Sequence, residues 1–568
     1  MNVCKFWNSM LTFYTTSFRK GRIKMDTITR RNFLKASAVS MGGIAASAML
    51  SACGATDENA GADKKKIVRF GLANAKVPLD MQRSTNSLSA SISDSICEAL
   101  LRWDETNKLV PVLLESIPQF EADGVTLPCT LKSGVKFHDG STLTSADVKY
   151  TFERMFTPET AAKSTYMYTS ILGADEMLAG KAKELAGFKI QDDTHFTFTL
   201  KAPFAAFPSN LAISYSHIFP KDACEKAGKD WGQGTNLIGT GRYKLVSNDE
   251  TTEVVLARFD DHHDGKPALD EIHYKYFDDL NTKMLAFKNG DIDYCDLDPS
   301  LLAQYQADAD VKDLIHSYES LGVHFINLNL KQGKGLEDVR VRQALSLAIN
   351  RQELVDTIAS GNAIAAGGWL APQTPGSLKD MGALEYNPDK AKALLAEAGV
   401  TNLKLTAKVR AGLSQKQVVA VQDYWSKIGV DLDVQVEDAG VWAKDWADGN
   451  LQITALGWYP LYADGDNHLY TYFYSTSAAK KSSFYNNHEV DALLDKARTS
   501  HDEQERADIY KQVDTKITRE DYATIPLYWP KGTFVAKPYV KGAAVGNLIY
   551  HTFELDVDTS DPNYNPQS

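Results

Sequence analysis

The sequence predicts an α/β fold with more than one domain. Between residues 403 and 446, stretches typical of strands alternate with stretches of helical periodicity, and this alternation indicates an α/β lobe. More than 500 of the 568 residues remain once a predicted export signal is set aside, which is too many for one hydrophobic core. We therefore expect two or three domains. The expected elements of this lobe are strands over 403–409 and 430–436, a helix over 415–428 that ends at Gly429, and a helix that starts within 442–446.

An export signal is predicted at the start of the chain. Arg30 and Arg31 precede a mostly small, apolar run from Ala36 to Met49, the order found in twin-arginine signals. The run is about fifteen residues, too short and too weakly apolar for a good transmembrane helix. A buried N-terminal helix is the alternative. Met25 lies just ahead of the signal, and we expect it to be the true start of translation.

A lipid anchor is predicted directly after that run. The sequence Leu-Ser-Ala-Cys that ends at Cys53 resembles the bacterial lipobox, which implies cleavage before Cys53 and acylation of its thiol. Residues 53–66 are polar and read as the anchored cysteine and a flexible tether. No second long apolar segment follows. We therefore expect an extracytoplasmic protein held to the cell membrane through the lipid on Cys53 alone.

The composition limits the partners. A formal net charge of −12 argues against nucleic acid or anionic lipid as a partner. The apolar fraction of 43% and the charged fraction of 24% are those of an ordinary soluble globular protein. Aromatic residues make up 10% of the chain and include 25 Tyr and 9 Trp. Rings of this kind line ligand clefts or fill cores, and the composition leaves both roles open.

Four cysteines remain if Cys53 is lipidated and Cys4 precedes the true start. Their wide spacing, with no Cys-x-x-Cys, argues against zinc or redox chemistry. An extracytoplasmic location permits disulfides, and free buried thiols are the alternative. The four are Cys97, Cys129, Cys224 and Cys295.

We find no signature of an enzyme, metal site or cofactor. The chain has no Gly-x-Ser-x-Gly, no His-Glu-x-x-His, no P-loop and no dinucleotide fingerprint. His138 beside Asp139 is too small a group for catalysis. His262-His263-Asp264 resembles a metal cluster, but adjacent side chains of an extended chain point apart, so a polar turn is favoured. An exported hydrolase, the alternative from another class, would need an activated nucleophile or a metal constellation.

Several helices are predicted with their caps. Apolar spacing indicates a helix over 89–101, and Thr144 followed by Asp147 predicts a capped helix start. Asp338 is expected to cap a helix whose arginines, Arg340, Arg342 and Arg351, form a solvated or ion-paired face, with an anion site as the alternative. Pro388 and Gly399 bound a further helix.

A family resemblance joins several separated motifs. Leu131 to Gly140 reads Leu-x-x-Gly-Val-Lys-Phe-His-Asp-Gly, and Leu-Thr-x-x-Asp-Val follows it. The stretch 338–351, Asp-Val-Arg-Val-Arg-Gln-Ala-Leu-Ser-Leu-Ala-Ile-Asn-Arg, is the most specific match. Residues 238–245 match as well, with Arg242 where the pattern has proline. Together these resemble the family 5 extracellular solute-binding proteins, the receptors of peptide, dipeptide and nickel ABC importers.

The resemblance implies a two-lobed fold of the large, type II periplasmic-binding-protein class, with an extra N-terminal subdomain. The lobes would close over the ligand, and the closed form would be recognised by the transporter. The expected divisions are a signal region over 1–52, the tether over 53–66, lobe I over 67–321 with the subdomain at about 110–235, lobe II over 322–528, and a return to lobe I with the tail over 529–568.

The resemblance also places a ligand site. Peptide receptors of this family have Gly-Trp at the positions of Gly457 and Trp458, with an aspartate three residues later for the ammonium of the peptide. Here that position is Leu461, and Asp464 matches a later, largely structural acid of the turn. A buried ammonium needs an anionic partner, so it is met elsewhere or the ligand has none. The candidate ligand-binding residues are Gly457, Trp458, Tyr459, Asp464, Asn86, Arg410, Tyr528 and Trp529.

The function implied is that of a monomeric substrate-binding lipoprotein, not an enzyme, which delivers a solute to the permease and ATPase of an ABC importer. A peptide is the favoured ligand, and a nickel chelate, a glycan or another small organic solute is the alternative. A receptor-derived chaperone or sensor would share the fold, and a neighbouring pair of permease and ATPase genes would argue for the importer.

Overall fold

The computed structural model describes residues 64–543, except 75, 77, 105 and 334, and residues 555–566. The chain divides into two units, 1–62 and 63–568, and every described residue belongs to the second. The twin-arginine signal, Met25 and Cys53 lie outside the described residues. No helix of the described part is both long and apolar enough to cross a membrane.

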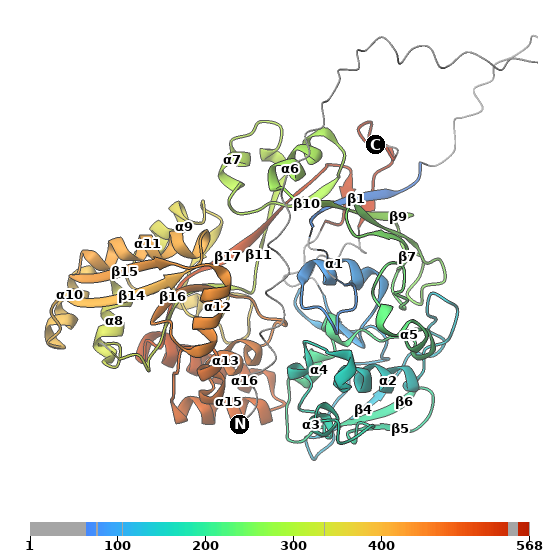
Figure 1. Ribbon diagram of the computed structural model, residues 1–568, viewed down its shortest axis with the longest axis horizontal. Coiled ribbons are helices and arrows are strands. Elements are labelled where there is room, and N and C mark those ends of the chain that lie inside the picture. The colour runs from blue at the N-terminus through green and yellow to red at the C-terminus, as the bar shows by residue number, and fades with distance from the viewer. Residues whose placement is uncertain are drawn as a thin grey trace, which may run out of the picture. The chain divides into compact units, whose positions relative to one another are not determined.

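A mixed sheet of twelve strands is the largest sheet in the described part of the chain (Figure 1). Strand β17 (Thr524–Ala536) lies at its middle and pairs antiparallel with its neighbours. On one side follow β12 (Val323–Leu328), β16 (Ile453–Trp458), β14 (Leu403–Val409) and β15 (Val430–Val436). On the other side follow β10 (Tyr294–Asp296), β1 (Ile67–Ala73), β9 (Glu271–Phe277), β8 (Glu253–Arg258) and β7 (Tyr243–Asp249), while β11 (Ile315–Glu319) and β13 (Ala363–Ala365) pair with β17 off this path.

Strand β17 belongs to both halves of the sheet (Figure 1). Its first part, up to Pro530, pairs with β12 and β13, and from Lys531 onward it pairs with β11 and β10. The change of partner falls between Pro530 and Lys531. The division of the chain into lobes at residues 321 and 528 stays a prediction.

Helices flank the two halves of the sheet. The first group contains α1 (Ser87–Ile96), α2 (Ser145–Phe156), α3 (Ala174–Leu178), α4 (Phe207–Asn210), α5 (Lys221–Ala227), α6 (Leu280–Asn289) and α7 (Leu302–Gln306). The second group contains α8 (Val339–Leu347), α9 (Arg351–Thr357), α10 (Pro388–Glu397), α11 (Leu413–Ser426), α12 (Ala439–Asp448), α13 (Gly465–Phe473), α14 (Ser475–Lys480), α15 (His488–Thr499) and α16 (Glu503–Thr515).

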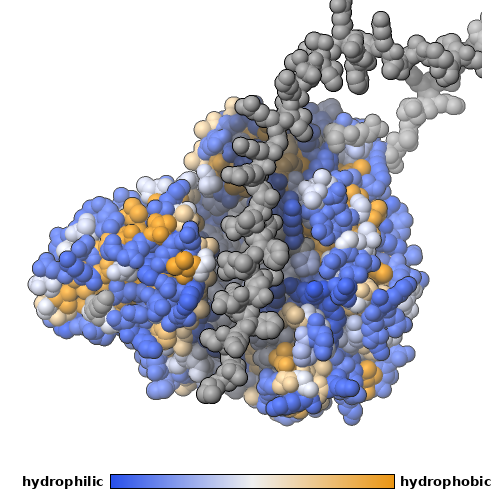
Figure 2. Space-filling model, viewed as in Figure 1, coloured by the Kyte–Doolittle hydropathy of each residue, from blue (hydrophilic) through white to orange (hydrophobic). Residues whose placement is uncertain are grey.

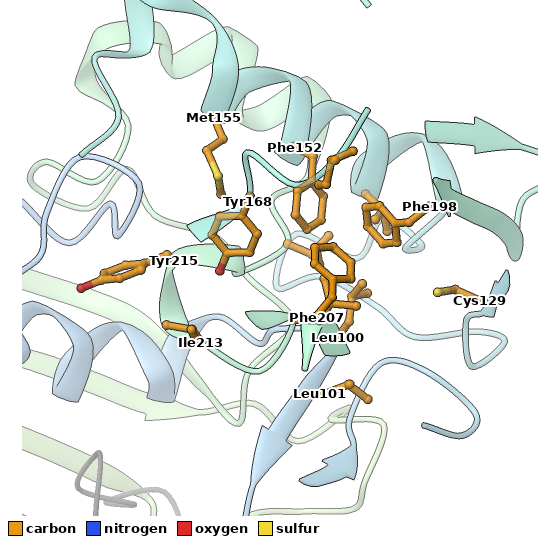
Figure 3. Close-up of a cluster of buried hydrophobic side chains, with 14 of the residues drawn as sticks. Leu100, Leu101, Cys129, Phe152, Met155, Tyr168, Phe198, Phe207, Ile213 and Tyr215 are labelled. Atoms are coloured by element: carbon orange, nitrogen blue, oxygen red, sulfur yellow. The ribbon is translucent and has the colours of Figure 1, made fainter. Parts of the chain in front are cut away.

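A separate apolar core lies in the region predicted as the extra subdomain (Figure 3). Strands β4 (Thr126–Thr130), β6 (His195–Thr199) and β5 (Phe188–Ile190) form a small antiparallel sheet beside α2. Phe152 of α2 meets the rings of Tyr168 and Phe198 edge-on, at centroid distances of 5.7 and 5.0 Å. Such edge-to-face pairs add to the free energy of burying the rings. Small hairpins complete the fold: β2 (Leu101–Trp103) with β3 (Leu109–Pro111), and β18 (Val540–Lys541) with β19 (Asp556–Val557).

Most predicted elements are confirmed. Strands 403–409 and 430–436 have the predicted bounds, and the Asp147 carboxylate accepts a bond from the backbone amide of Thr144 at 2.9 Å, as part of the capping box of α2. The helix predicted over 89–101 ends earlier, at Ile96. Its last residues are wrong because Leu101–Trp103 pairs with β3 and is extended.

The arginines of the 338–351 motif correct a prediction. Arg340 is ion-paired with Asp338, as expected. Arg342 and Arg351 are instead buried: Arg342 donates to the carbonyls of Leu336 and Asp521, and Arg351 to that of Pro526. The helical pattern shows which side of a helix is polar, but not which segments pack against it. Here backbone carbonyl groups of neighbouring segments pack against Arg342 and Arg351.

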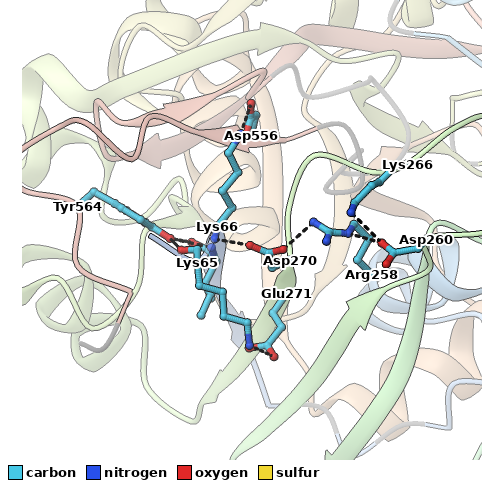
Figure 4. A network of polar contacts seen from close by, with 10 residues as sticks. Lys65, Lys66, Arg258, Asp260, Lys266, Asp270, Glu271, Asp556 and Tyr564 are labelled. Atoms are coloured by element: carbon cyan, nitrogen blue, oxygen red, sulfur yellow. Dashed lines mark hydrogen bonds and ion pairs between the residues drawn. The ribbon is translucent and has the colours of Figure 1, made fainter. Parts of the chain in front are cut away.

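A polar network holds the described start of the chain to its end (Figure 4). The Lys66 amide donates to Asp270, and its ammonium pairs with Asp556 at 2.8 Å. The Tyr564 hydroxyl donates to the Lys65 carbonyl and accepts from the Ile67 amide. The end of the predicted tether is thus bound to the fold.

Hydrophilic residues dominate the face drawn in Figure 2.

Candidate functional site

A cavity of about 290 Å³ lies between α1, the segment 212–217 and the loop that follows β16. Pro460 and Leu461 of that loop line it, and so does Asn86, a predicted ligand-binding residue. The volume is at the lower end of the range for small-molecule sites. The charged lining residues balance in sign: Asp94, Glu98 and Asp264 against Arg102, Lys132 and Arg242.

Helix α1 presents a polar stripe to this cavity. Asn86 caps the helix by accepting a bond from the Leu88 amide at 2.8 Å. Ser87, Ser91 and Asp94 follow at steps of four and three residues, which places them on one face of the helix. Helical spacing therefore carries Asp94 into the wall of the cavity, and Glu98 joins it from the extended segment just after the helix.

Asp94 lies at the end of that stripe. Its Oδ1 is 2.9 Å from Nε2 of His217, and the two side chains are 11% and 4% exposed. Within the described residues, neither Oδ1 of Asp94 nor Nδ1 of His217 has a partner that meets hydrogen-bond geometry. Asp94 is therefore an acid with spare hydrogen-bonding capacity at the cavity wall.

Glu98 has its carboxylate occupied by three donors. Oε1 lies 3.1 Å from Nε2 of His262, Oε2 lies 2.9 Å from Nε2 of His263, and the Thr240 hydroxyl donates to Oε2 at 2.8 Å. Burial opposes ionisation of Glu98, but the two imidazoles outweigh it and hold the pKa of this carboxyl well below its usual range. The glutamate is thus ionised inside the fold.

His262 and His263 lie in a turn, as predicted, but their side chains do not point apart. The two residues lie in a turn after β8, where their rings come within 4.3 Å of each other and both face Glu98. Adjacent side chains point apart only when the chain is extended, and here it bends. Glu98, 164 residues earlier, was not recognised because sequence spacing does not reveal such a contact.

A second hollow lies beside β16 and the start of α11 and contains Arg410 and Gly457. The amide group of Gln417 donates to the Tyr528 hydroxyl at 2.6 Å and lies 2.9 Å from Nδ1 of His324. Nε2 of His324 lies 3.0 Å from the Tyr459 hydroxyl. Burial lowers the pKa of His324 to about 4, so this chain of contacts carries a neutral imidazole at neutral pH.

Other candidate residues are tied to the surrounding structure. The guanidinium of Arg410 lies 4.9 Å above the Trp442 ring. Trp458 is partly buried, with the Lys481 ammonium 4.8 Å over its ring, while Tyr459 is 55% exposed. Trp529 is buried in the apolar core of the second half.

Asp464 is a helix cap. Its Oδ1 accepts bonds from the Asp466 amide and the Tyr510 hydroxyl at 2.9 and 2.8 Å, and Arg506 donates to its Oδ2 at 2.6 Å. These contacts occupy both carboxylate oxygens and favour the structural role. Leu461 lines the cavity and packs against the apolar core shown in Figure 3. The position where peptide receptors of the family are expected to have an aspartate is therefore uncharged here.

The four cysteines of the described part form no disulfide bonds. All four cysteines of the described part are buried and carry free thiols. Burial raises the pKa of each thiol, which leaves the groups unreactive at neutral pH.

Sequence reasoning missed Asp94, His217, His324 and Gln417. The helical spacing of Asp94 with Ser87 and Ser91 was visible and places Asp94 on one face with them. No local signal pairs it with His217, because the contact depends on how α1 packs against a loop more than 100 residues away.

Comparison with known families gives one match over most of the chain. The model described as bacterial extracellular solute-binding proteins, family 5 Middle, matches residues 108–480. That range includes both hollows in part, with the loop after β16 and the second half of the sheet.

Named relatives and solved structures agree with this match. The glutathione-binding protein GsiB of Pectobacterium atrosepticum is 30% identical over 451 residues, which cover 77% of this chain and 84% of the relative. The dipeptide-binding protein of Escherichia coli strain K12 is 27% identical and covers 79% of this chain and 86% of its own. The Helicobacter pylori periplasmic binding protein DppA, solved in complex with the peptide STSA, has a TM-score of 0.71 at 24% identity, covering 86% and 98% of the two chains. Its likeness concerns the fold, which is the two-lobed fold that the sequence predicts.

Proposed function

Because the chain belongs to family 5 of the bacterial extracellular solute-binding proteins, we propose that it is the peptide receptor of an ABC importer. It captures a short peptide outside the cytoplasm between two closing lobes and delivers it to the permease. The named relatives are binding proteins for glutathione and dipeptides, which supports a role in binding rather than catalysis.

The observation that carries the peptide assignment is the charge of the cavity wall. A free peptide has an ammonium at one end and a carboxylate at the other, and this cavity offers both acidic and basic side chains within a partly apolar wall. A nickel chelate or another small organic solute remains the second candidate, and the imidazoles of His217 and His263 in the same wall favour it.

Asp94 is the proposed partner of the ammonium. Leu461 is apolar, the carboxylate of Glu98 already has three donors, and the oxygens of Asp464 are occupied. Asp94 has spare capacity beside the cavity. A carboxylate that is already partly desolvated loses less on binding a cation than an exposed one.

The remaining parts of the proposal concern the protein's place in the cell. Arg30 and Arg31 direct export, Cys53 carries the lipid anchor, and residues up to 63 act as a tether that keeps the receptor close to its transporter. The protein acts as a monomer and needs no cofactor. The ligand contacts proposed in the second hollow are Gly457, Tyr459, Arg410 and Tyr528, with Trp458 and Trp529 behind them.

Calorimetric titration with a panel of ligands tests the proposal. The panel holds dipeptides to pentapeptides, glutathione, the same compounds with acetylated amines, and nickel with free histidine. We expect free-amino peptides to bind and acetylated ones to bind at least about tenfold more weakly, because the charge-assisted contact is lost. Binding of the nickel complex with no binding of any peptide would replace the first candidate by the second.

A further inference from the structure

Two imidazoles and a carboxylate converge at the wall of the same cavity that Asp94 lines. The ligating atoms of Glu98, His262 and His263 all lie within 4.8 Å of one another. The only group of three or more such side chains in the described residues is this one. We propose that Glu98, His262 and His263 bind a divalent transition-metal ion of the zinc or nickel type.

The distances suit such an ion. Metal–nitrogen and metal–oxygen bonds of about 2.1 Å at right angles place the two ligand atoms about 3.0 Å apart. Here the imidazole nitrogens lie 3.1 and 2.9 Å from the two oxygens of Glu98. An ion therefore needs only small shifts of the side chains to take the place of the two protons that now join them.

The donor set selects the class of metal. Two imidazoles with one carboxylate suit zinc, nickel, cobalt and copper, whereas calcium and magnesium require oxygen ligands. The Thr240 hydroxyl, 2.8 Å from Oε2 of Glu98, supplies the outer hydrogen bond that orients a ligating carboxylate.

One hydrogen bond must be given up. The Asp264 amide donates to Nδ1 of His262 at 3.2 Å, which leaves the ring proton on Nε2. Metal binding at Nε2 moves this proton to Nδ1, so the ring stays neutral and Nδ1 no longer accepts from the Asp264 amide. Binding becomes weaker as the pH falls, because protons compete with the metal for the imidazoles. The bond lost is long and joins two uncharged groups, and such bonds contribute little beside a metal–imidazole bond.

The site opens to the ligand cavity. Glu98 and His263 line the cavity, whereas the side chain of His262 is fully buried behind them. Three protein ligands leave further coordination positions, and these face the cavity. The ion would therefore offer a Lewis-acidic contact to a carbonyl, amine or carboxylate of a bound solute, in addition to Asp94.

Metal binding is tested without any solute, so that its failure is distinct from failure of the receptor assignment. Untagged protein is stripped with a chelator, dialysed, and titrated with zinc chloride and nickel chloride by calorimetry in two buffers that differ in protonation enthalpy. We expect one ion per chain by elemental analysis, and the two buffers separate the heat of metal binding from the heat of any proton exchange.

His263→Gln and His262→Gln are the test variants, and His273→Gln is the control. His273 lies 3.1 and 3.6 Å from the carboxylates of Glu271 and Glu253, and so it is an imidazole between acids without a second histidine. We expect each test variant to lose at least about tenfold in metal affinity and the control to lose none. Since His262 is buried, unchanged far-UV circular dichroism and melting of the stripped variants confirm that they fold.

Two results would overturn the site: no stoichiometric binding of either zinc or nickel to the wild-type protein, or equal affinity in His263→Gln and the wild type. A cobalt-loaded sample gives an independent check, because visible absorption bands of cobalt bound to imidazole should vanish in the same variants. Bands that persist in both variants would place the ion elsewhere.

Discussion

The surroundings of Asp94 leave its carboxylate available to a ligand in the cavity. The side chain is nearly buried, its Oδ1 lies 2.9 Å from Nε2 of His217, and the residue lines the cavity. Of the cavity-facing acids, Glu98 is occupied by three donors and Asp264 pairs with Arg242 at 2.7 Å. A cationic group of a ligand therefore finds its least occupied carboxylate at Asp94.

Replacing Asp94 with Asn keeps the shape and removes the charge. We expect Asp94→Asn to weaken binding of free-amino peptides by about 1.5–3 kcal/mol, or roughly 10- to 150-fold, because a hydrogen bond to a charged group is lost. Calorimetry measures the effect, with Asp389→Asn on the exposed first turn of α10 as the matched control. Equal losses for free and acetylated peptides would show that Asp94 does not meet the ammonium.

His468 makes the protein sensitive to acid. It is fully buried in α13, neither ring nitrogen has a hydrogen-bond partner within the described residues, and burial lowers its pKa to about 3. A pKa that is lower in the folded than in the unfolded state, where it is about 6.5, means that the unfolded chain takes up the proton first. Stability from this group is therefore complete above pH 6.5 and is lost as the pH falls toward 3.

The His468→Leu variant tests this dependence. Between pH 7 and pH 5 the wild type should lose about 2 kcal/mol of unfolding free energy through His468, and the variant should lack that part of the decline. Denaturant unfolding at several pH values measures it. Parallel curves for the two proteins from pH 7 to pH 4 would contradict the assignment, and His195→Leu, at an exposed position, serves as the control.

At the scale of the elements, buried arginines hold helices to the sheet. Arg351 at the start of α9 donates to the Pro526 carbonyl of β17 at 2.7 Å and to the Ser346 hydroxyl at 2.9 Å. Burial, with repulsion from Arg519, lowers the pKa of its guanidinium to about 9. The carbonyls that it satisfies lie at the end of α8 and in the strand that joins the two halves of the sheet.

Loss of this arginine should be costly. We expect Arg351→Ala to lower the unfolding free energy by about 2–4 kcal/mol, because it leaves a cavity and buried carbonyls without donors. Arg340→Ala, which removes an exposed ion pair with Asp338, should change it by less than about 1 kcal/mol. Denaturant unfolding of both variants checks the contrast, and similar losses for the two would contradict the different roles given to these arginines.

Local chemistry predicted the elements better than the contacts between them. Strand alternation marked residues 403–409 and 430–436, and the Thr144–Asp147 pair marked the start of α2, because these signals lie within a few residues of each other. The pairing of Asp94 with His217 and of Glu98 with His262 spans more than 100 residues. Such contacts depend on packing, which no local pattern records.

At the scale of the whole molecule, β17 is the element that both halves of the sheet share. Its pairing changes from β13 to β11 between Pro530 and Lys531. Any motion of one half against the other must therefore bend or twist this strand and the other segments that connect the halves. Loop residues Leu461 and Tyr462, which follow β16 of one half, pack against the subdomain core that contains Phe207 of the other. A receptor that closes on its ligand would make and break this contact.

Closure predicts a change in dimensions. We expect the radius of gyration from small-angle X-ray scattering to fall when a binding peptide is added, because the lobes approach each other. The same peptide concentration should leave Asp94→Asn largely unchanged if its affinity is reduced as predicted. A radius that stays constant in the wild type at saturating peptide would exclude closure on binding.

Anchoring is a property of the full chain and is tested on it. We expect Cys53→Ser to release the exported protein from the membrane fraction, because the proposed lipid anchor is attached to this thiol. Fractionation of cells with an immunoblot measures the distribution. A variant that stays in the membrane fraction at wild-type level would show that the lipid is not the anchor.

The central claim is that this cavity binds a free-amino peptide, and native mass spectrometry of the protein isolated from its own cells tests it most directly. We predict an adduct of a few hundred daltons that is released by activation and fragments as a short peptide, and that is depleted in Asp94→Asn. A bound species without peptide fragments, or peptide adducts equal in amount in Asp94→Asn and the wild type, would contradict the account.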